Sequence, residues 1–277
     1  MIISTCLCSK KTKACFQITI RYQNETTFQA YNGLVIGQCN HCGLLKTIND
    51  SHNSNNNEPI SDSHHYETNL KNLSFFFKPL IEKIKQFKPS GSVLDVGCST
   101  GILLSLLQKD GFKTYGIEPN KKAYTLANKK LGKNIFYGVL STFVKTHKQQ
   151  YDCIIYNHTL EHIKNIHKEL SIVKTILKQD GLFILGVPNT ANIIFYIRKK
   201  FWESLLPNQH IWHFNTHYLT KLLQQYGLQT LNVSFTDHTR TDYPFIKKIY
   251  FSFLTLLNKL MNTGEAVLLI AKNNKPI

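Results

Sequence analysis

Along residues 66–277, short apolar runs alternate with segments whose apolar positions have helical spacing. The runs have the length and composition of buried strands, and the intervening segments predict helices that pack on them. The predicted strands are residues 93–96, 113–117, 134–137, 151–156, 182–187, 228–235 and 266–271. In one intervening segment, a single stripe of Ile166, Leu170, Val173 and Leu177 predicts core packing. This alternation is typical of an α/β fold with a doubly wound parallel sheet, whose ligand sites lie at the carboxyl ends of the strands.

The first 48 residues have a different pattern. Alternating segments at 16–21 and 27–31 predict short strands of a small, cysteine-containing β unit. Residues 49–65 are polar, proline-broken and without periodicity, which predicts a linker. The following residues to position 87 have helical spacing, and Pro79 is expected to bend or restart that helix. We therefore expect an N-terminal unit at 1–48, a linker at 49–65 and an α/β domain at 66–277.

Two segments of the α/β domain mix aromatic and aliphatic residues with lysines. They are residues 192–206 and 243–261, within expected inserts at 190–215 and 240–262. Such a composition suits a lid helix that packs on its own domain and caps a substrate, which we favour over a helix that lies on a membrane as a peripheral contact. No run approaches eighteen uninterrupted apolar residues, so no transmembrane span is expected.

Charge and cysteine content narrow the function classes. The 277 residues have a formal net charge of +16, yet only three of the 33 basic residues are arginines, the residue that recognises phosphates and guanine edges best. A solvated lysine surface is therefore favoured over a nucleic-acid partner, with anionic substrates, a membrane surface and RNA as the alternatives. The seven cysteines are irregularly spaced and the first residues lack a basic head with an apolar run, so we expect a cytoplasmic protein.

The most informative motif is Val-Leu-Asp-Val-Gly-Cys-Ser-Thr-Gly at residues 93–101. Gly97 and Gly101 let the backbone turn tightly and approach a ligand, and the next helix directs its unpaired N–H groups at the same place. Glu118 ends the next strand, 23 residues beyond Asp95, where its carboxylate can accept hydrogen bonds from two ribose hydroxyls. These residues predict a nucleoside-containing cofactor.

The turn reads Gly97-x-Ser99-x-Gly101, and bulky residues follow it where a dinucleotide fingerprint has its third glycine. It resembles motif I of the class I S-adenosylmethionine-dependent methyltransferases. Residues 151–163, 177–189 and 210–216 are similar to three later motifs of that family, in the same order. The resemblance covers about residues 66–272 and is closest to the methyltransferase-23 subgroup, which includes the ubiquinone-biosynthesis O-methyltransferases and many sugar and polyketide methyltransferases.

The resemblance implies a Rossmann-like sheet of seven strands, with the last strand inserted antiparallel. It also implies an enzyme that methylates a small-molecule acceptor, such as a sugar, polyketide, quinone-type or lipid-linked hydroxyl, with S-adenosylmethionine as cofactor. The cofactor-binding residues that it implies are Asp95, Gly97, Cys98, Ser99, Gly101, Glu118, Pro119, Asn157 and His158. The implied catalytic residues are His158, Glu161 and His162, which follow the fourth strand.

Some relatives bind a divalent cation at the equivalent of these residues. Here the ligand set would be His158, Glu161, His162 and either His210 or His213. The alternative, which we favour, is that Glu161 and His162 hydrogen-bond the loop. In either case a histidine with a near-neutral pKa would suit the role of general base.

The N-terminal cysteines resemble the zinc ribbon that many methyltransferases of this subgroup carry. Cys39-Asn40-His41-Cys42-Gly43 has the form of a zinc knuckle, whereas Cys6-x-Cys8 is one residue shorter than the usual pair, and Cys15 is a candidate substitute. A structural zinc on Cys6, Cys8, Cys39 and Cys42 and a metal-free remnant with buried thiols both remain open.

Two other function classes remain as alternatives. An RNA methyltransferase would use the basic surface and the cysteine unit, but residues 157–160 read Asn-His-Thr-Leu and not the Asn-Pro-Pro-Tyr of a nucleotide-flipping pocket. A non-catalytic, zinc-bearing adaptor would require a decayed cofactor site, whereas Asp95, Gly97, Gly101 and Glu118 are all present.

Overall fold

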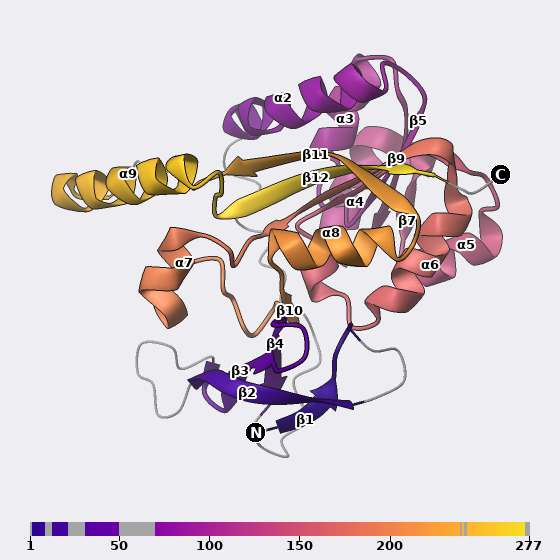
Figure 1. Cartoon of the computed structure of the whole chain (residues 1–277). Coiled ribbons are helices and arrows are strands. Elements are labelled where there is room, and N and C mark those ends of the chain that lie inside the picture. Colours follow the sequence, from indigo (N-terminus) through magenta and orange to yellow (C-terminus); the bar gives the residue numbers. More distant parts are fainter. Residues whose placement is uncertain are drawn as a thin grey trace.

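The computed structural model describes residues 2–8, 13–21, 31–49, 70–238, 240 and 243–274. Its α/β domain is built on a sheet of seven strands in the order β11-β12-β9-β8-β5-β6-β7 (Figure 1). The strands are β5 (Ser92–Val96), β6 (Lys113–Glu118), β7 (Ile135–Tyr137), β8 (Tyr151–Asn157), β9 (Leu177–Pro188), β11 (Leu228–Thr236) and β12 (Ala266–Asn273). The helices are α2 (Leu70–Phe87), α3 (Ile102–Lys109), α4 (Lys121–Leu131), α5 (Leu140–Thr146), α6 (Ile166–Ile176), α7 (Ile193–Arg198), α8 (Thr216–Gln224) and α9 (Phe245–Leu260).

Strand pairing confirms the predicted fold class. Strands β7, β6, β5, β8 and β9 are parallel, and β12 runs antiparallel between β9 and β11. Every predicted strand of this sheet is present, with β9 starting five residues early. At its start the register with β8 jumps from Tyr151↔Leu177 to Cys153↔Leu182, so the residues between Leu177 and Leu182 form a bulge inside the strand. Leu177 therefore belongs to β9 and not to the stripe on α6.

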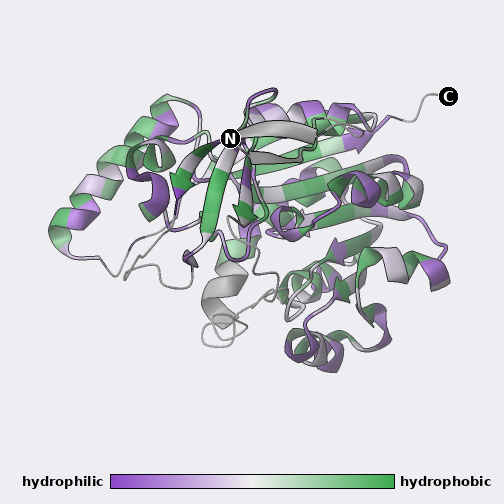
Figure 2. Cartoon of the chain, turned by 90° about the horizontal axis from the view of Figure 1, so that it is seen from below, coloured by the Kyte–Doolittle hydropathy of each residue, from purple (hydrophilic) through white to green (hydrophobic). Residues whose placement is uncertain are grey.

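Side chains of the parallel strands alternate between two hydrophobic clusters. Val93 packs on one face with α2, α3 and α4, whereas Leu94 packs on the other face with α6 and α8. Because both faces are covered by helices, the strands are apolar along most of their length (Figure 2). Helix α2 continues through Pro79, so no second helix starts there; Leu80, Ile81 and Ile84 hold it in one of the two clusters.

The N-terminal unit is an antiparallel sheet with the order β1-β2-β3-β4-β10. Its strands are β1 (Ile2–Thr5), β2 (Lys13–Arg21), β3 (Leu34–Cys39), β4 (Leu45–Asn49) and β10 (Trp212–His213). The strand expected at 16–21 is confirmed within β2, whereas β1, β3 and β4 were not predicted. The segment expected at 27–31 and the expected linker lie almost entirely outside the described residues.

Strand β10 comes from the α/β domain and joins the two parts of the chain. Trp212 pairs with Lys46 and His213 with Leu45, and the N–H of Thr47 donates to the Ile211 carbonyl at 2.9 Å. Near this junction, Cys6, Leu7, Cys39 and Leu44 share one buried cluster with residues of α8. The N-terminal unit is therefore packed against the α/β domain (Figure 1). Among the described residues, no helix combines the length and apolarity needed to traverse a bilayer.

Candidate functional site

The turn between β5 and α3 is tightly constrained. The N–H groups of Gly97 and Cys98 both donate to the Ile117 carbonyl on β6, at 2.8 and 3.1 Å. Gly97 has φ 80°, and a Cβ at this position would lie 2.8 Å from Cγ2 of Thr159 and still closer to its Oγ1. Ser99 also has a positive φ, 49°, an uncommon conformation for a residue with a side chain. Glycine is thus the residue that allows the turn to approach the loop after β8.

Two buried carboxylates lie beside this turn. Glu118 accepts hydrogen bonds from the N–H of Ser99 at 2.8 Å and from that of Asn120 at 2.7 Å. Burial raises the pKa of Glu118 despite these two bonds. Burial, with a further contribution from the charge of Glu118, raises the pKa of Asp95 to about 7. A cationic ligand group placed here would offset the cost of ionising both acids.

The other predicted cofactor-binding residues lie at the same edge of the sheet. Asn157 ends β8, and His158 follows it with φ 54° and donates its N–H to the Gly186 carbonyl at 2.8 Å. Pro119 directly follows Glu118 at the end of β6. The thiol of Cys98 packs in the core beneath Gly116, so only its backbone faces the turn. The structure therefore brings these residues together around the carboxyl ends of β5, β6 and β8.

Glu161 and three histidines form a second cluster after β8. Glu161 lies in the short helix η3 (Leu160–His162) and is buried, with His158 Nδ1 3.6 Å from its Oε1. That distance is too long for a hydrogen bond, and among the described residues neither carboxylate oxygen has a hydrogen-bond partner. Burial alone would raise the pKa of Glu161, but His158, His210 and His162 lower it. The cluster is therefore suited to a cation or to a protonated imidazole.

The histidines around Glu161 have distinct surroundings. His162 Nδ1 lies 3.0 Å from the Gln209 carbonyl. A carbonyl oxygen only accepts, so in the neutral ring Nδ1 carries the proton and Nε2 keeps a lone pair. Burial lowers the pKa of His210 to about 4, which keeps this ring neutral at physiological pH. One ligand atom each of Glu161, His162 and His210 lies within 4.8 Å of the others.

Of the predicted ligands of a divalent cation, Glu161, His162 and His210 lie close enough together to share one ion, whereas His158 is not in this group. His213 Nε2 instead lies 2.8 Å from the Thr47 hydroxyl on β4. Burial lowers the pKa of His213 to about 3, so this histidine is neutral and serves the contact with the N-terminal unit.

The four predicted zinc ligands also lie together. Sγ of Cys6 is 3.5 Å from that of Cys42, Sγ of Cys8 is 3.8 Å from that of Cys39, and all four sulfurs lie within 4.8 Å of one another. Zinc–sulfur bonds of about 2.3 Å in a tetrahedron separate the sulfurs by about 3.8 Å. The short Cys6-x-Cys8 spacing therefore does not prevent a tetrahedral arrangement. Cys15 lies on β2, opposite Ile3.

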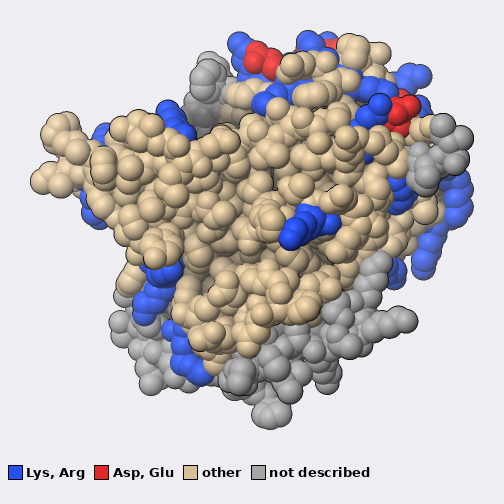
Figure 3. All heavy atoms as spheres, viewed as in Figure 1, with Lys and Arg blue, Asp and Glu red and all other residues tan. Residues whose placement is uncertain are grey.

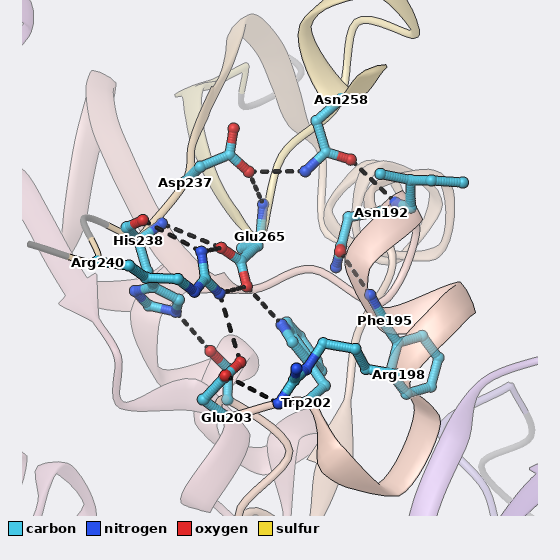
Figure 4. Close-up of polar contacts among 12 residues, drawn as sticks. Asn192, Phe195, Arg198, Trp202, Glu203, Asp237, His238, Arg240, Asn258 and Glu265 are labelled. Atoms are coloured by element: carbon cyan, nitrogen blue, oxygen red, sulfur yellow. Dashed lines mark hydrogen bonds and ion pairs between the residues drawn. The ribbon is translucent and has the colours of Figure 1, made fainter. Parts of the chain in front are cut away.

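Both expected inserts follow strands whose carboxyl ends point to the site. Glu265, directly before β12, is fully buried and accepts from Trp202 Nε1 at 2.8 Å and from Arg240 at 2.8 and 2.7 Å (Figure 4). Asp237 accepts from Asn258 of α9 at 2.7 Å. This network ties the segment after β9 to the segment after β11.

Two residues that contribute to the site were not predicted from the sequence. Thr159 packs against Gly97, and the carbonyl of Gln209 fixes the tautomer of His162. Each contact joins residues that are distant in the sequence, and a threonine or a glutamine in a loop carries no local signal of such a role.

Comparison with known proteins agrees with this geometry. A family model described as a methyltransferase domain matches residues 63–233. The C-methyltransferase NovU of Streptomyces niveus is 24% identical over 148 residues, which are 52% of this chain and 34% of NovU. The ubiquinone biosynthesis O-methyltransferase of Glaesserella parasuis is 29% identical over 127 residues, 42% of this chain and 54% of that protein. The chain thus spans only about a third to a half of these relatives.

A solved structure shows the same fold at lower identity. The magnesium protoporphyrin IX methyltransferase ChlM of Synechocystis, with bound SAH, superposes with a TM-score of 0.52 at 17% identity. The match covers 73% of this chain and 83% of ChlM. The predicted family resemblance and the predicted Rossmann-like fold are therefore confirmed.

Proposed function

Because this chain belongs to the methyltransferase-domain family, we propose that it transfers the methyl group of S-adenosylmethionine to a hydroxyl of a small-molecule acceptor. The observation that carries the proposal is the arrangement of Gly97, Asp95 and Glu118 at the carboxyl edge of the sheet. Gly97 lets the turn pack against Thr159 in the loop after β8, Glu118 can accept from ribose hydroxyls, and two buried acids suit a cationic cofactor. The cofactor supplies a methyl group already activated by its sulfonium.

The residues of the chain then have to position the acceptor and take its proton. His162 is the best candidate for the base, because Gln209 holds Nδ1 as a donor and leaves the Nε2 lone pair for the acceptor hydroxyl. With the cofactor bound, the sulfonium would give up its methyl group to the acceptor oxygen and leave as a neutral thioether, while Nε2 of His162 would take the hydroxyl proton. The neighbouring Glu161 carboxylate stabilises the imidazolium that forms.

We expect His162→Ala to lower kcat by about 100-fold or more, the usual contribution of a general base, with little change in cofactor affinity. The assay uses tritiated S-adenosylmethionine and a panel of sugar, polyketide, quinone-type and lipid-linked hydroxyl compounds. His217→Ala, a change at an exposed histidine of α8, is the matched control and should retain the wild-type rate. If His162→Ala is as fast as the control, His162 is not the base.

A divalent cation held by Glu161, His162 and His210 is the second candidate arrangement. The orphaned carboxylate oxygens of Glu161 and the neutral ring of His210 favour it. Such a cation would orient the acceptor oxygens and lower the pKa of the hydroxyl. Full activity of the wild type after chelation and gel filtration supports His162 as base, whereas loss of activity with recovery on adding Mg²⁺ or Zn²⁺ supports the cation.

The ion pairs of two arginines favour a small-molecule acceptor over RNA. Arg198 pairs with Glu203 at 3.1 Å, and Arg240 pairs with Glu265 at 2.7 Å. Two of the three arginines of the chain are thus committed to acidic partners within the protein. The intact cofactor turn also argues against a non-catalytic adaptor.

We further propose that Cys6, Cys8, Cys39 and Cys42 bind one structural zinc ion. Four thiolates fill a tetrahedral coordination shell and leave no position for a substrate. Gly43, with φ 74°, closes the turn in which its N–H donates to the Cys39 carbonyl at 2.8 Å, as expected of a zinc knuckle.

Protein purified without chelator should contain close to one equivalent of zinc by elemental analysis. Cys39→Ser removes one of four ligands and should lower the zinc content at least about tenfold, since the remaining three bind far more weakly. Cys153→Ala, in the core of β8 and outside the cluster, is the control and should keep the metal. Zinc-free wild-type protein would reassign the four cysteines to packing.

A further inference from the structure

Helix α9 projects from the body of the protein and has two apolar faces (Figure 1). One face packs on the domain through the buried Phe251 and Leu254. The other face consists of Ile246, Ile249, Phe253, Leu256 and Leu260, which are between 52% and 81% exposed. Their spacing of three and four residues places them on a single stripe, turned away from the packed face. A contiguous apolar surface exposed to water is unfavourable unless another surface covers it.

The neighbouring α7 and the short helix η4 (Lys199–Phe201) extend this surface. Tyr196, Ile197 and Phe201 are each about half or more exposed, whereas Ile194 packs with Phe251 of α9 in one cluster. The two segments are also joined through Asn258, whose Oδ1 accepts from the N–H of Ile193 at 2.9 Å (Figure 4). We call the exposed apolar residues of α7, η4 and α9 the apolar platform.

The charged side chains on α7, η4 and α9 themselves are all basic, and the nearest acid along the chain, Glu203, pairs with Arg198 at 3.1 Å. Lys199, Lys200, Lys247, Lys248 and Lys259 lie within or beside it. Residues 193–202 and 245–261 contain no aspartate or glutamate. Figure 3 shows the projecting arm as a surface mostly without charged side chains and edged by basic ones, whereas the acidic side chains of this view lie at the top and upper right of the molecule.

We propose that the apolar platform docks on an anionic lipid bilayer, with α9 lying in the interface. An apolar stripe with aromatic residues and flanking lysines is the pattern that inserts between headgroups while the ammonium groups bind lipid phosphates. A second copy of the chain fits poorly, because it presents the same lysines on a molecule of net charge +16. Helices α7 and α9 follow β9 and β11, whose carboxyl ends lie at the same edge of the sheet as the candidate site, so docking places that edge toward the membrane surface.

The test is co-sedimentation of the full chain with vesicles of phosphatidylcholine alone or mixed with phosphatidylglycerol. We expect binding to the mixed vesicles, weaker binding at high salt, and little binding to phosphatidylcholine. Ile246→Ser/Phe253→Ser and, separately, Lys247→Glu/Lys248→Glu should each lower the partition coefficient about tenfold or more. Leu231→Ser/Val233→Ser on β11, which removes exposed apolar side chains elsewhere, should leave it unchanged.

Three outcomes would overturn the proposal. The first is an equal partition coefficient for the platform variants and the wild type. The second is equal binding to vesicles with and without phosphatidylglycerol. The third is a dimer, seen by light scattering and lost in the platform variants, in a protein that does not bind vesicles. Near-UV circular dichroism and S-adenosylmethionine titration of the same variants show whether they remain folded. Vesicle binding needs neither cofactor nor acceptor. A failure to bind vesicles would therefore not contradict the proposed methyl transfer, and a failure of methyl transfer would not contradict membrane docking.

Discussion

Gly97→Val is expected to abolish S-adenosylmethionine binding in isothermal titration calorimetry. The β-branched side chain meets two obstacles: the positive φ of 80° and the side chain of Thr159, whose Cγ2 is 2.8 Å from the position of a Cβ. Either the turn moves or Thr159 moves, and both line the candidate cofactor site. We therefore expect a loss of affinity of at least about 100-fold, or about 2.7 kcal/mol.

Gly111→Val is the matched control for this variant. Gly111 has φ 88°, but nothing lies within 4 Å of a Cβ added there. It therefore shares the backbone strain without the collision, and its cofactor affinity should match that of the wild type. Glu118→Ala should also abolish binding, because it removes the acceptor for the ribose together with the bonds from Ser99 and Asn120. Unchanged affinity in both Gly97→Val and Glu118→Ala would remove the basis of the cofactor assignment.

Arg240→Met is expected to destabilise the protein by about 3–5 kcal/mol, the usual result of removing one partner of a buried ion pair. Glu265 is 0% exposed and Arg240 only 7%, with two hydrogen bonds between them. The variant leaves Glu265 with Trp202 and the N–H of His238 as partners for a buried charge. The measurement is urea denaturation at pH 7. Arg198→Met, which breaks a more exposed pair with Glu203, is the control and should cost about 1 kcal/mol or less.

The pH dependence provides a second readout of the same pair. Burial alone would raise the pKa of Glu265, but the bonds from Arg240 and the charge of His238 lower it overall. A lowered folded-state pKa contributes stability above the ordinary glutamate pKa, and this contribution is lost as pH falls through the folded value. Arg240→Met should therefore lose most stability at neutral pH and less in acid. A loss within about 1 kcal/mol at pH 7 would contradict a structural role for the pair.

The large sheet could be predicted because its strands are buried on both faces. Runs such as residues 153–156 need apolar side chains at successive positions, and this signal does not depend on knowing the neighbouring strand. The small sheet could not be predicted in the same way. β3 contains Gly37 and Gln38, which interrupt its apolar pattern, and β10 is a strand only because residues 45 and 46 pair with it from more than 160 positions away.

In the candidate site, too, the residues whose spacing is fixed locally could be predicted, and those brought together by the tertiary fold could not. Gly97 and Glu118 could be recognised because one supersecondary unit fixes their spacing. The partition of the histidines could not be predicted, since it depends on which ring meets Thr47 and which meets Glu161. The pair of Arg240 and Glu265 also carries no local signal, because two charged residues 25 positions apart usually lie on the surface. Of the whole candidate site, the cofactor turn is therefore the part that the sequence alone predicts best.

The most direct test of the central claim is a crystal structure of the chain soaked with S-adenosylhomocysteine. We expect the adenosyl group over the Gly97 turn, with both ribose hydroxyls within hydrogen-bond distance of the Glu118 carboxylate. A nucleoside bound elsewhere on the protein, or a saturated soak that leaves this edge of the sheet without ligand, would contradict the assignment of the cofactor site and with it the proposed reaction.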